Sequence, residues 1–220
     1  MSTPSQEPVI QIDELRHYAA IVENPLLRRA SEIMLADPRW LTTPGSSSKH
    51  HVWAGGLVTH TLQVMEGAVA HVDVAARHEA MLDRDVVITA AIFHDTGKLD
   101  EYLPLAEGGW GYTPNHFMLR HILRSRDYFR DCCVRATQSL TGIATYFRDD
   151  PREPVVFPAP SFETPFPDPT EHVNHCILTH HGEPEWGSIG VPLTREAHCV
   201  HLADMNSVWA IVRRVVKKKA

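Results

Sequence analysis

VVITAAIFHDTGK, residues 86–98, joins a predicted apolar helix to a pair of polar residues, His94 and Asp95. Residues 86–93 are apolar with one threonine interrupting, so the helix that they predict should be buried on every side. His94 and Asp95 follow directly, and a charged carboxylate is costly to bury unless it is paired or binds a metal. Gly97 then provides a flexible turn. Taken alone, the pair fits either a metal site or a structural turn capped by Asp95.

The composition indicates a globular protein rather than a disordered or membrane-bound one. Of the 220 residues, 43% are hydrophobic, enough for a sizeable core, and 22% are charged. The formal net charge of -6 argues against a general nucleic-acid surface, so any such contact should be local. No apolar run approaches the roughly 20 residues of a membrane span. Fifteen histidines stand out, because histidine serves both metal binding and proton transfer near neutral pH.

The cysteines predict the compartment. None of the four, Cys132, Cys133, Cys176 and Cys199, forms a C-x-x-C pair, and no secretory signal precedes them. This usage is typical of a reducing environment, so we expect a cytoplasmic protein.

Hydrophobic periodicity predicts an all-α chain that forms one domain over residues 1–220. N-terminal helices are expected within residues 1–44, interrupted at Pro25. Further helices are predicted at 55–77, 86–93, 115–131 and 132–147, from 170 or 171 to 181, and from 192 or 194 to 216, with a loop or small hairpin at 104–114. Residues 148–170 contain seven prolines in 23 positions, which excludes a regular helix and predicts a long Pro-rich loop inserted into the domain.

Polar residues interrupt apolar helix faces at three other places. His60 lies in the first half of its helix, the pair His180-His181 ends another, and Asp204 lies in the last helix. Metal sites in helical bundles are built this way, from inward ligands on facing helices. Imidazoles mixed with carboxylates suit manganese, iron, cobalt, nickel or zinc better than calcium.

The ordered motifs resemble those of a known superfamily. GGLVTHTLQV (55–64), AAIFHDTGK (90–98) and HLADMNS (201–207) are similar to the H…HD…D arrangement of the HD-domain superfamily of metal-dependent phosphohydrolases. SSSKHHVWAGGLVTHTLQV (46–64) and HHGEPEWGSIGVPLTREA (180–197) resemble one branch, the YhaM-type 3′→5′ exoribonucleases. In that branch a Tyr-Thr pair precedes a helix whose histidine lies nine positions after the tyrosine, which points to His121.

This resemblance implies an HD-domain helical bundle with a metal site in its core. A first divalent cation would be held by His60, His94, Asp95 and Asp204, and a second by His121, His180 and His181 with Asp95 as a bridge. One or two ions fit the pattern. Mn²⁺ is the expected ion, with iron, cobalt, nickel or zinc as alternatives.

The resemblance also implies an activity. A metal-activated water would cleave a phosphoester of a nucleotide, or of the 3′ end of a short single-stranded nucleic acid. Asp95, Lys98 and His121 are the expected catalytic residues, and Lys98 would clamp a phosphate oxygen or assist the leaving group.

Three features depart from the exoribonuclease pattern. Those enzymes carry an OB-fold domain before the HD domain, whereas residues 1–44 read helical. Arg120 stands where the family usually has glycine, and residues 148–170 read as an insertion. Two alternatives therefore stay open: an HD-type, relaxase-like DNA-processing module of a mobile element, and a non-catalytic binding domain stabilised by its metal.

Residues beside the motifs have open roles. His50 and His51 either bind phosphate or hold the metal-binding side chains in place without binding the metal themselves. At least two of Trp53, Trp110 and Trp186 are expected to pack in the core, and any other to stack a base.

Overall fold

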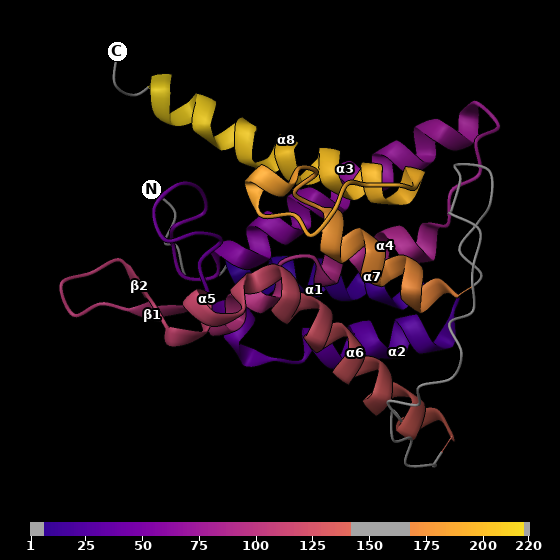
Figure 1. Cartoon of the computed structure of the whole chain (residues 1–220), viewed down its shortest axis with the longest axis horizontal. Coiled ribbons are helices and arrows are strands. Elements are labelled where there is room, and N and C mark those ends of the chain that lie inside the picture. Colours follow the sequence, from indigo (N-terminus) through magenta and orange to yellow (C-terminus); the bar gives the residue numbers. More distant parts are fainter. Residues whose placement is uncertain (1–6, 142–167, 218–220) are drawn as a thin grey trace.

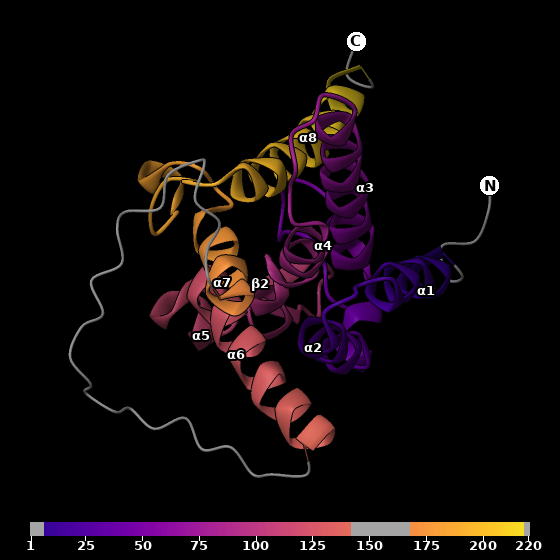
Figure 2. The same cartoon turned by 90° about the vertical axis from the view of Figure 1, so that its right-hand side faces the viewer.

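The computed structural model describes residues 7–141 and 168–217, and its centre is helix α4 (Arg84–Phe93). Every residue from Val86 to Phe93 is buried, as the apolar pattern predicts. Asp83 caps the helix by accepting a hydrogen bond from the backbone N–H of Val86. Figure 2 shows α4 in the middle of the molecule, with other helices around it. The polar pair that follows α4 therefore enters the interior.

The N-terminal region forms two helices, α1 (Glu7–Ala20) and α2 (Pro25–Leu35), and the short 3-10 helix η1 (Pro38–Leu41). The interruption predicted at Pro25 is confirmed. Asn24 caps α2, because its side chain accepts hydrogen bonds from the backbone N–H groups of Leu26 and Leu27. Both helices pack against the central part of the bundle.

Helix α3 (Gly56–Arg77) lies beside α8 (Arg195–Lys217), and this pair forms the most extensive helix–helix contact within residues 7–141 and 168–217 (Figure 1). The two helices approach each other closely at Gly67, which has no side chain. A Cβ on Gly67 would lie 3.2 Å from the Cβ of Ala203. Between them in sequence, α7 (Pro169–Thr179) begins after Asp168, which accepts a hydrogen bond from the backbone N–H of Thr170. The loop after α7 contains the 3-10 helix η3 (Pro184–Trp186).

A small hairpin extends from the bundle (Figure 1). Strands β1 (Tyr102–Pro104) and β2 (Trp110–Tyr112) pair antiparallel, with Tyr102 opposite Tyr112. This confirms the hairpin among the two predicted possibilities for residues 104–114. The hairpin follows the 3-10 helix η2 (Thr96–Asp100), which leads out of the HD motif.

The predicted helix break at Cys132 is wrong. Helix α6 (Arg120–Thr141) runs through Cys132 and Cys133, which are both buried with Phe129 on its inner face. No glycine or proline interrupts this stretch, so nothing ends the helix there. The break lies earlier instead, between the short helix α5 (Pro114–Met118) and α6.

Two other boundaries differ from their predictions. The helix expected from 170 or 171 to 181 begins at Pro169 and ends at Thr179, and the helix expected from 192 or 194 begins at Arg195. Most of the Pro-rich segment predicted over 148–170, together with the end of the helix predicted to reach 147, lies outside the described residues. The helix-dominated, all-α class is confirmed, and no helix in the described ranges is long and apolar enough to cross a membrane.

Candidate metal centre

The first cluster joins α3, the end of α4 and α8. His60 lies in the second turn of α3, His94 and Asp95 follow the last turn of α4, and Asp204 lies in α8. His60 Nε2 is 3.1 Å from Asp95 Oδ2, 3.2 Å from Asp204 Oδ1 and 3.2 Å from His94 Nε2. All four side chains are buried. The four ligands expected for the first cation therefore meet at one point.

The second cluster faces the other oxygen of Asp95. His121 Nε2, from α6, lies 3.5 Å from Asp95 Oδ1 and 3.4 Å from His181 Nε2. His180 Nε2, at the end of α7, lies 3.7 Å from Asp95 Oδ1. Asp95 thus offers one carboxylate oxygen to each cluster, and all seven residues expected as ligands come together in two clusters that share it.

These spacings suit divalent cations. Ligand atoms placed about 2.1 Å from a metal, at tetrahedral or octahedral angles, are roughly 3.0–3.4 Å apart. Among the described residues, Asp95 Oδ1 and His180 Nε2 are buried without a hydrogen-bond partner. Orphaned buried polar atoms are costly unless another group satisfies them. A cation in the second cluster would satisfy both atoms, so the residues present fit the metal that the motifs imply.

Neighbouring groups orient the five histidine rings. In each ring Nδ1 faces a partner outside the clusters, and Nε2 faces inwards. The partners are Ser207 Oγ for His60, the Ala91 carbonyl for His94, Glu101 Oε1 for His121, the Ile177 carbonyl for His180 and the Trp186 carbonyl for His181. A ring that donates Nδ1–H to a carbonyl keeps the lone pair on Nε2, which is then free to bind metal.

The charges also favour cation binding. Burial alone would raise the pKa of the Asp95 carboxyl, but the Lys98 ammonium and nearby histidines hold that pKa well below its usual range. Burial likewise opposes ionisation of Asp204, yet the hydrogen bond from His60 lowers its pKa. Burial opposes protonation of His60, but Asp204 and Asp95 raise its pKa, so a cation bound there would displace a proton from this ring. Burial lowers the pKa of His180 well below its ordinary value, so this ring is neutral. Ionised carboxylates and neutral imidazoles are the forms that bind metals.

Lys98 is part of this centre rather than a surface residue. Its Nζ lies 2.6 Å from Asp95 Oδ2, and its side chain is buried. Helix η2 places Lys98 three residues after Asp95, so the two side chains meet across one turn. A positive charge beside the shared carboxylate keeps that carboxylate ionised when no cation is bound.

Glu101 is a site residue that sequence reasoning missed. Its carboxylate is buried, with Oε1 3.5 Å from His121 Nδ1 and Oε2 3.4 Å from His116 Nδ1. Burial would raise the pKa of Glu101, but the two histidines hold it below the ordinary value. A carboxylate behind a ligand histidine is a common metal-site arrangement. The signal in the sequence is weak, since a lone glutamate after HDTGKLD reads as a surface residue.

Gly97 has a different role from the flexible turn that was predicted. Its φ is not positive, and a Cβ at this position would lie 2.1 Å from the backbone oxygen of His121. The backbone of η2 therefore packs directly on the first turn of α6. Glycine is needed here for close approach, and this approach brings His121 to Asp95.

A chain of hydrogen bonds connects His51, in the loop before α3, to His60 in the first cluster. His51 Nε2 lies 3.1 Å from Gln63 Oε1, and Ser207 Oγ donates to the same oxygen at 2.9 Å. Ser207 in turn contacts His60. Burial lowers the pKa of both His50 and His51 to about 3, so neither carries a positive charge for phosphate. Of the two roles left open for this pair, His51 has the contacts of a supporting residue.

The tryptophans near the motifs are mostly exposed. Trp53 and Trp186 are 45% and 56% exposed, and Trp110 is half-buried. The prediction that at least two of them pack in the core is wrong. They lie in loops and on the hairpin, outside the helical core, where Trp40 is the buried indole instead.

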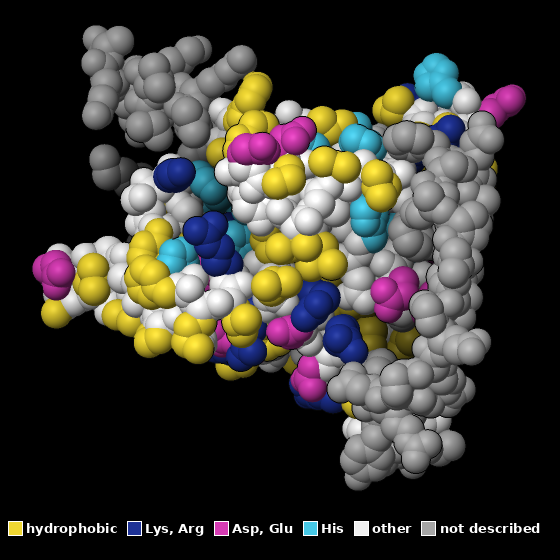
Figure 3. All heavy atoms as spheres, viewed as in Figure 1, with side chains coloured by type: hydrophobic (Ala, Val, Ile, Leu, Met, Phe, Trp, Pro, Cys, Tyr) yellow, Lys and Arg dark blue, Asp and Glu magenta, His cyan; other side chains and the backbone are white. Residues whose placement is uncertain are grey.

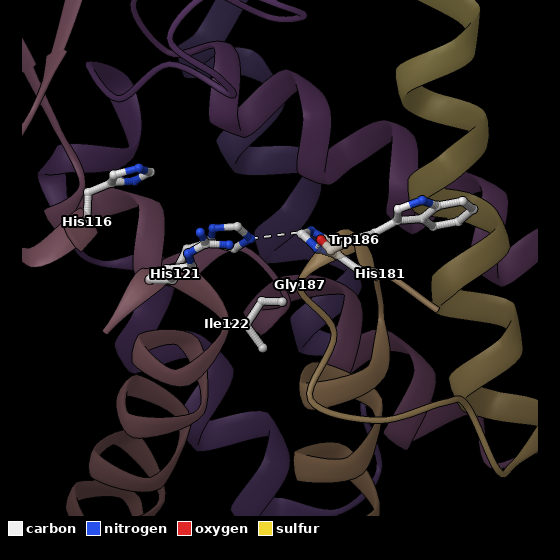
Figure 4. Close-up of a pocket in the computed structure, with 7 residues that line it drawn as sticks. His116, His121, Ile122, His181, Trp186 and Gly187 are labelled. Carbon is white, nitrogen blue, oxygen red and sulfur yellow. Dashed lines mark hydrogen bonds between the residues drawn. The ribbon is translucent and has the colours of Figure 1, made fainter. Parts of the chain in front are cut away.

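A pocket opens beside the second cluster. It has a volume of about 200 Å³ and is lined by His116, Arg120, His121, Ile122, His181, Trp186 and Gly187. Figure 4 shows His121 and His181 pointing toward each other, while the Trp186 ring turns away from them. Figure 3 shows histidine side chains beside Lys and Arg side chains on the face between the hairpin and α8. Solvent and ligands therefore reach the second cluster from this side.

A family model described as HD domain matches residues 57–206, which include all seven candidate ligands. The chain belongs to the HD-domain family. Its resemblance to that family, drawn from the three motifs, is confirmed. Family membership, with divalent metals bound by HD domains and a His/Asp cluster in this chain, supports a metal-binding hydrolase.

Curated relatives of this HD-domain chain are exoribonucleases by name. It is 26% identical over 196 residues to the 3′-5′ exoribonuclease YhaM of Bacillus subtilis (strain 168), covering 88% of this chain and 52% of that one. It is 25% identical over 199 residues to YhaM of Shouchella clausii (strain KSM-K16), covering 90% and 52%. The chain thus spans about half the length of the curated relatives it matches. No solved structure matches it.

Proposed function

We propose that this HD-domain chain is a metal-dependent phosphodiesterase that acts on a nucleotide or on the 3′ end of short single-stranded nucleic acid. The observation that carries the proposal is the position of Asp95, whose two oxygens face two histidine clusters. Two cations sharing a carboxylate are typical of enzymes that cleave phosphoesters. The relatives named as 3′-5′ exoribonucleases support a nucleic-acid substrate.

The metal ions would supply positive charge that attracts a phosphate and acidifies water. The residues proposed to hold them are the first cluster of His60, His94, Asp95 and Asp204 and the second of His121, His180 and His181, with Asp95 shared. Either one or two ions are consistent with this set. The mixed imidazole and carboxylate donors favour manganese, iron, cobalt, nickel or zinc over calcium. The resemblance to the exoribonuclease branch makes Mn²⁺ the expected ion, with the others as alternatives.

The side chains around the metal centre have separate proposed roles. Asp95 and Asp204 bring negative charge that two cations more than offset, which leaves the centre positive toward a phosphate. Lys98, which contacts Asp95 Oδ2, is placed to hold a phosphate oxygen or to assist the leaving group once a cation engages that carboxylate. His121, whose ring is held by Glu101, lines the pocket and would orient a substrate that enters it from solvent.

Digestion of a 5′-labelled single-stranded RNA, and of its DNA counterpart, tests the proposal. The reactions contain Mn²⁺ and compare wild type with Asp95→Ala. We expect products shortened stepwise from the 3′ end by the wild type and none by the variant. Intact oligonucleotides with hydrolysis of mononucleotides or small diesters would keep the phosphohydrolase and reject the nucleic-acid substrate. Equal activity of the two proteins would reject the metal centre as the active site.

A further inference from the structure

The pocket beside the second cluster contains a positively charged side chain, Arg120, that the proposed chemistry does not use. Arg120 immediately precedes the ligand His121, and it lines the pocket together with His181 and Gly187. Its side chain is exposed. In the described ranges, Arg120 makes neither a hydrogen bond nor an ion pair, whereas Arg39 and Arg124 are both paired with Asp100.

The backbone of Arg120 is held in an uncommon conformation. Its φ is +52°, in the left-handed region that favours glycine. The residue opens α6 after the break at Leu119, so this conformation turns the chain and aims His121 into the centre. A residue other than glycine in this conformation lowers the stability of the folded chain, so folding by itself does not explain an arginine here. We therefore look for a function of the guanidinium.

The guanidinium reaches the loop after α7. Arg120 Nη1 lies 3.6 Å from the point that a Cβ on Gly187 would occupy, and His181 Nδ1 lies 3.8 Å from the same point. Gly187 has φ +93° and no side chain, so it leaves room there. His181 turns Nε2 toward His121 and Nδ1 toward the Trp186 carbonyl. The guanidinium and the His181 ring therefore border the same space at Gly187.

We propose that Arg120 binds a second phosphate of the substrate, next to the one held at the metal centre. This inference rests on the proposed function and narrows it to substrates with more than one phosphate, such as an oligonucleotide. An arginine presents a planar fork of donors that matches phosphate oxygens. The net charge of -6 makes such a local cation more important, since the protein as a whole repels a polyanion.

The test compares two substrates in Mn²⁺, a single-stranded hexanucleotide RNA and bis(p-nitrophenyl) phosphate, which has no second phosphate. Arg120→Gly removes the cation and suits the positive φ, so the variant is expected to fold with a melting temperature close to that of the wild type. We expect its ratio of kcat/KM for the RNA to kcat/KM for the small diester to fall at least about ten-fold, mainly through KM for the RNA. Arg120→Lys should recover part of this loss, because it keeps the charge without the fork.

Salt dependence gives a second readout. Loss of one phosphate contact should reduce the slope of log affinity against log salt by about 0.7 for a single strand. Arg77→Gln is the matched control, because it removes one exposed cation near the end of α3, roughly 26 Å along the helix from His60. The control should change neither the ratio nor the slope.

An unchanged substrate ratio and salt slope in Arg120→Gly would overturn the inference while leaving the proposed function intact. If the wild type cleaves neither substrate, the proposed function fails instead. Fluorescence anisotropy with a labelled hexanucleotide in Mn²⁺ then tests Arg120 by itself. Weaker binding by Arg120→Gly than by Arg77→Gln supports the second phosphate site, and equal binding rejects it.

Discussion

His94 and His180 occupy matching positions at the ends of α4 and α7. Each ring donates Nδ1–H to the carbonyl three residues earlier, Ala91 at 2.8 Å and Ile177 at 2.7 Å, and the two ring centroids lie 5.1 Å apart. Both Nε2 atoms face Asp95, at 3.4 Å and 3.7 Å. The same hydrogen bond to the preceding turn thus orients one histidine ligand on each side of the Asp95 carboxylate.

Asp95→Asn should remove both metal binding and activity. The amide keeps the shape of the side chain but not its negative charge, and one of its two positions becomes a donor. We expect hydrolysis to fall at least about a thousand-fold, since a metal contributes several kcal/mol to such a transition state. Metal content per chain by mass spectrometry should fall with it. A variant that retains two ions and turnover would refute the bridging role.

Metal removal should lower thermal stability. A cation that binds only the folded state at about 100 times its Kd contributes roughly 2.7 kcal/mol. For a chain of this size that corresponds to a melting temperature lower by roughly 5–10 °C after EDTA treatment. Circular dichroism melts before EDTA, after EDTA and after Mn²⁺ is restored would measure it. Identical melts in all three conditions would argue that the centre binds no divalent ion.

Glu101→Gln should weaken the second metal site more than the first. Glu101 touches no candidate metal position and acts by orienting His121. Loss of such a carboxylate typically weakens metal affinity about 10–100-fold. Calorimetric titration with Mn²⁺ should show one of the two binding steps weakened and the other little changed. Glu107→Gln, on the exposed turn of the hairpin, is the matched control. A uniform loss at both steps would indicate a general structural effect instead.

Gly97→Ala should destabilise the fold and displace His121. The added Cβ would lie 2.1 Å from the His121 backbone oxygen, and backbone atoms cannot move aside cheaply. We expect a loss of about 1–3 kcal/mol in the free energy of unfolding, together with weaker metal binding at the second cluster. Urea unfolding measures the first effect. Gly190→Ala, whose Cβ would meet only Thr179 Cγ2 at 3.8 Å, should be close to neutral. Comparable losses in the two variants would contradict the packing argument.

Acid should destabilise the protein partly through Asp100. Burial opposes its ionisation, but hydrogen bonds from Arg124 and Arg39 hold the pKa of Asp100 below its ordinary value. A depressed carboxyl pKa contributes stability that is present above the unfolded value, about 4, and is lost as pH falls through the folded value. Asp100→Asn should cost about 1–3 kcal/mol at pH 7 and less near pH 3. Parallel stability curves for wild type and variant from pH 7 to pH 3 would exclude this contribution.

Patterns between near neighbours in the chain predicted much of the molecule. The buried α4, the interruption at Pro25 and the helix from Gly56 to Arg77 follow from apolar periodicity and turn residues, which act over a few positions. Six of the seven candidate ligands follow from motifs that place costly polar groups on or beside apolar helix faces, and His121 follows from the resemblance to the exoribonuclease branch. These are local properties, so the sequence by itself determined the helical class and the types of residue in the centre.

The packing of distant segments decided the rest. That Asp95 divides its two oxygens between two clusters depends on where α6, α7 and α8 lie relative to α4. The supporting roles of Glu101 and Ser207 depend on contacts between distant parts of the chain. Glu101 is 20 residues from its partner His121, and Ser207 is 147 residues from its partner His60. The break before Arg120 and the role of Gly97 also come from close contact between η2 and α6. No local pattern encodes such contacts, because they form only when the core brings remote segments together.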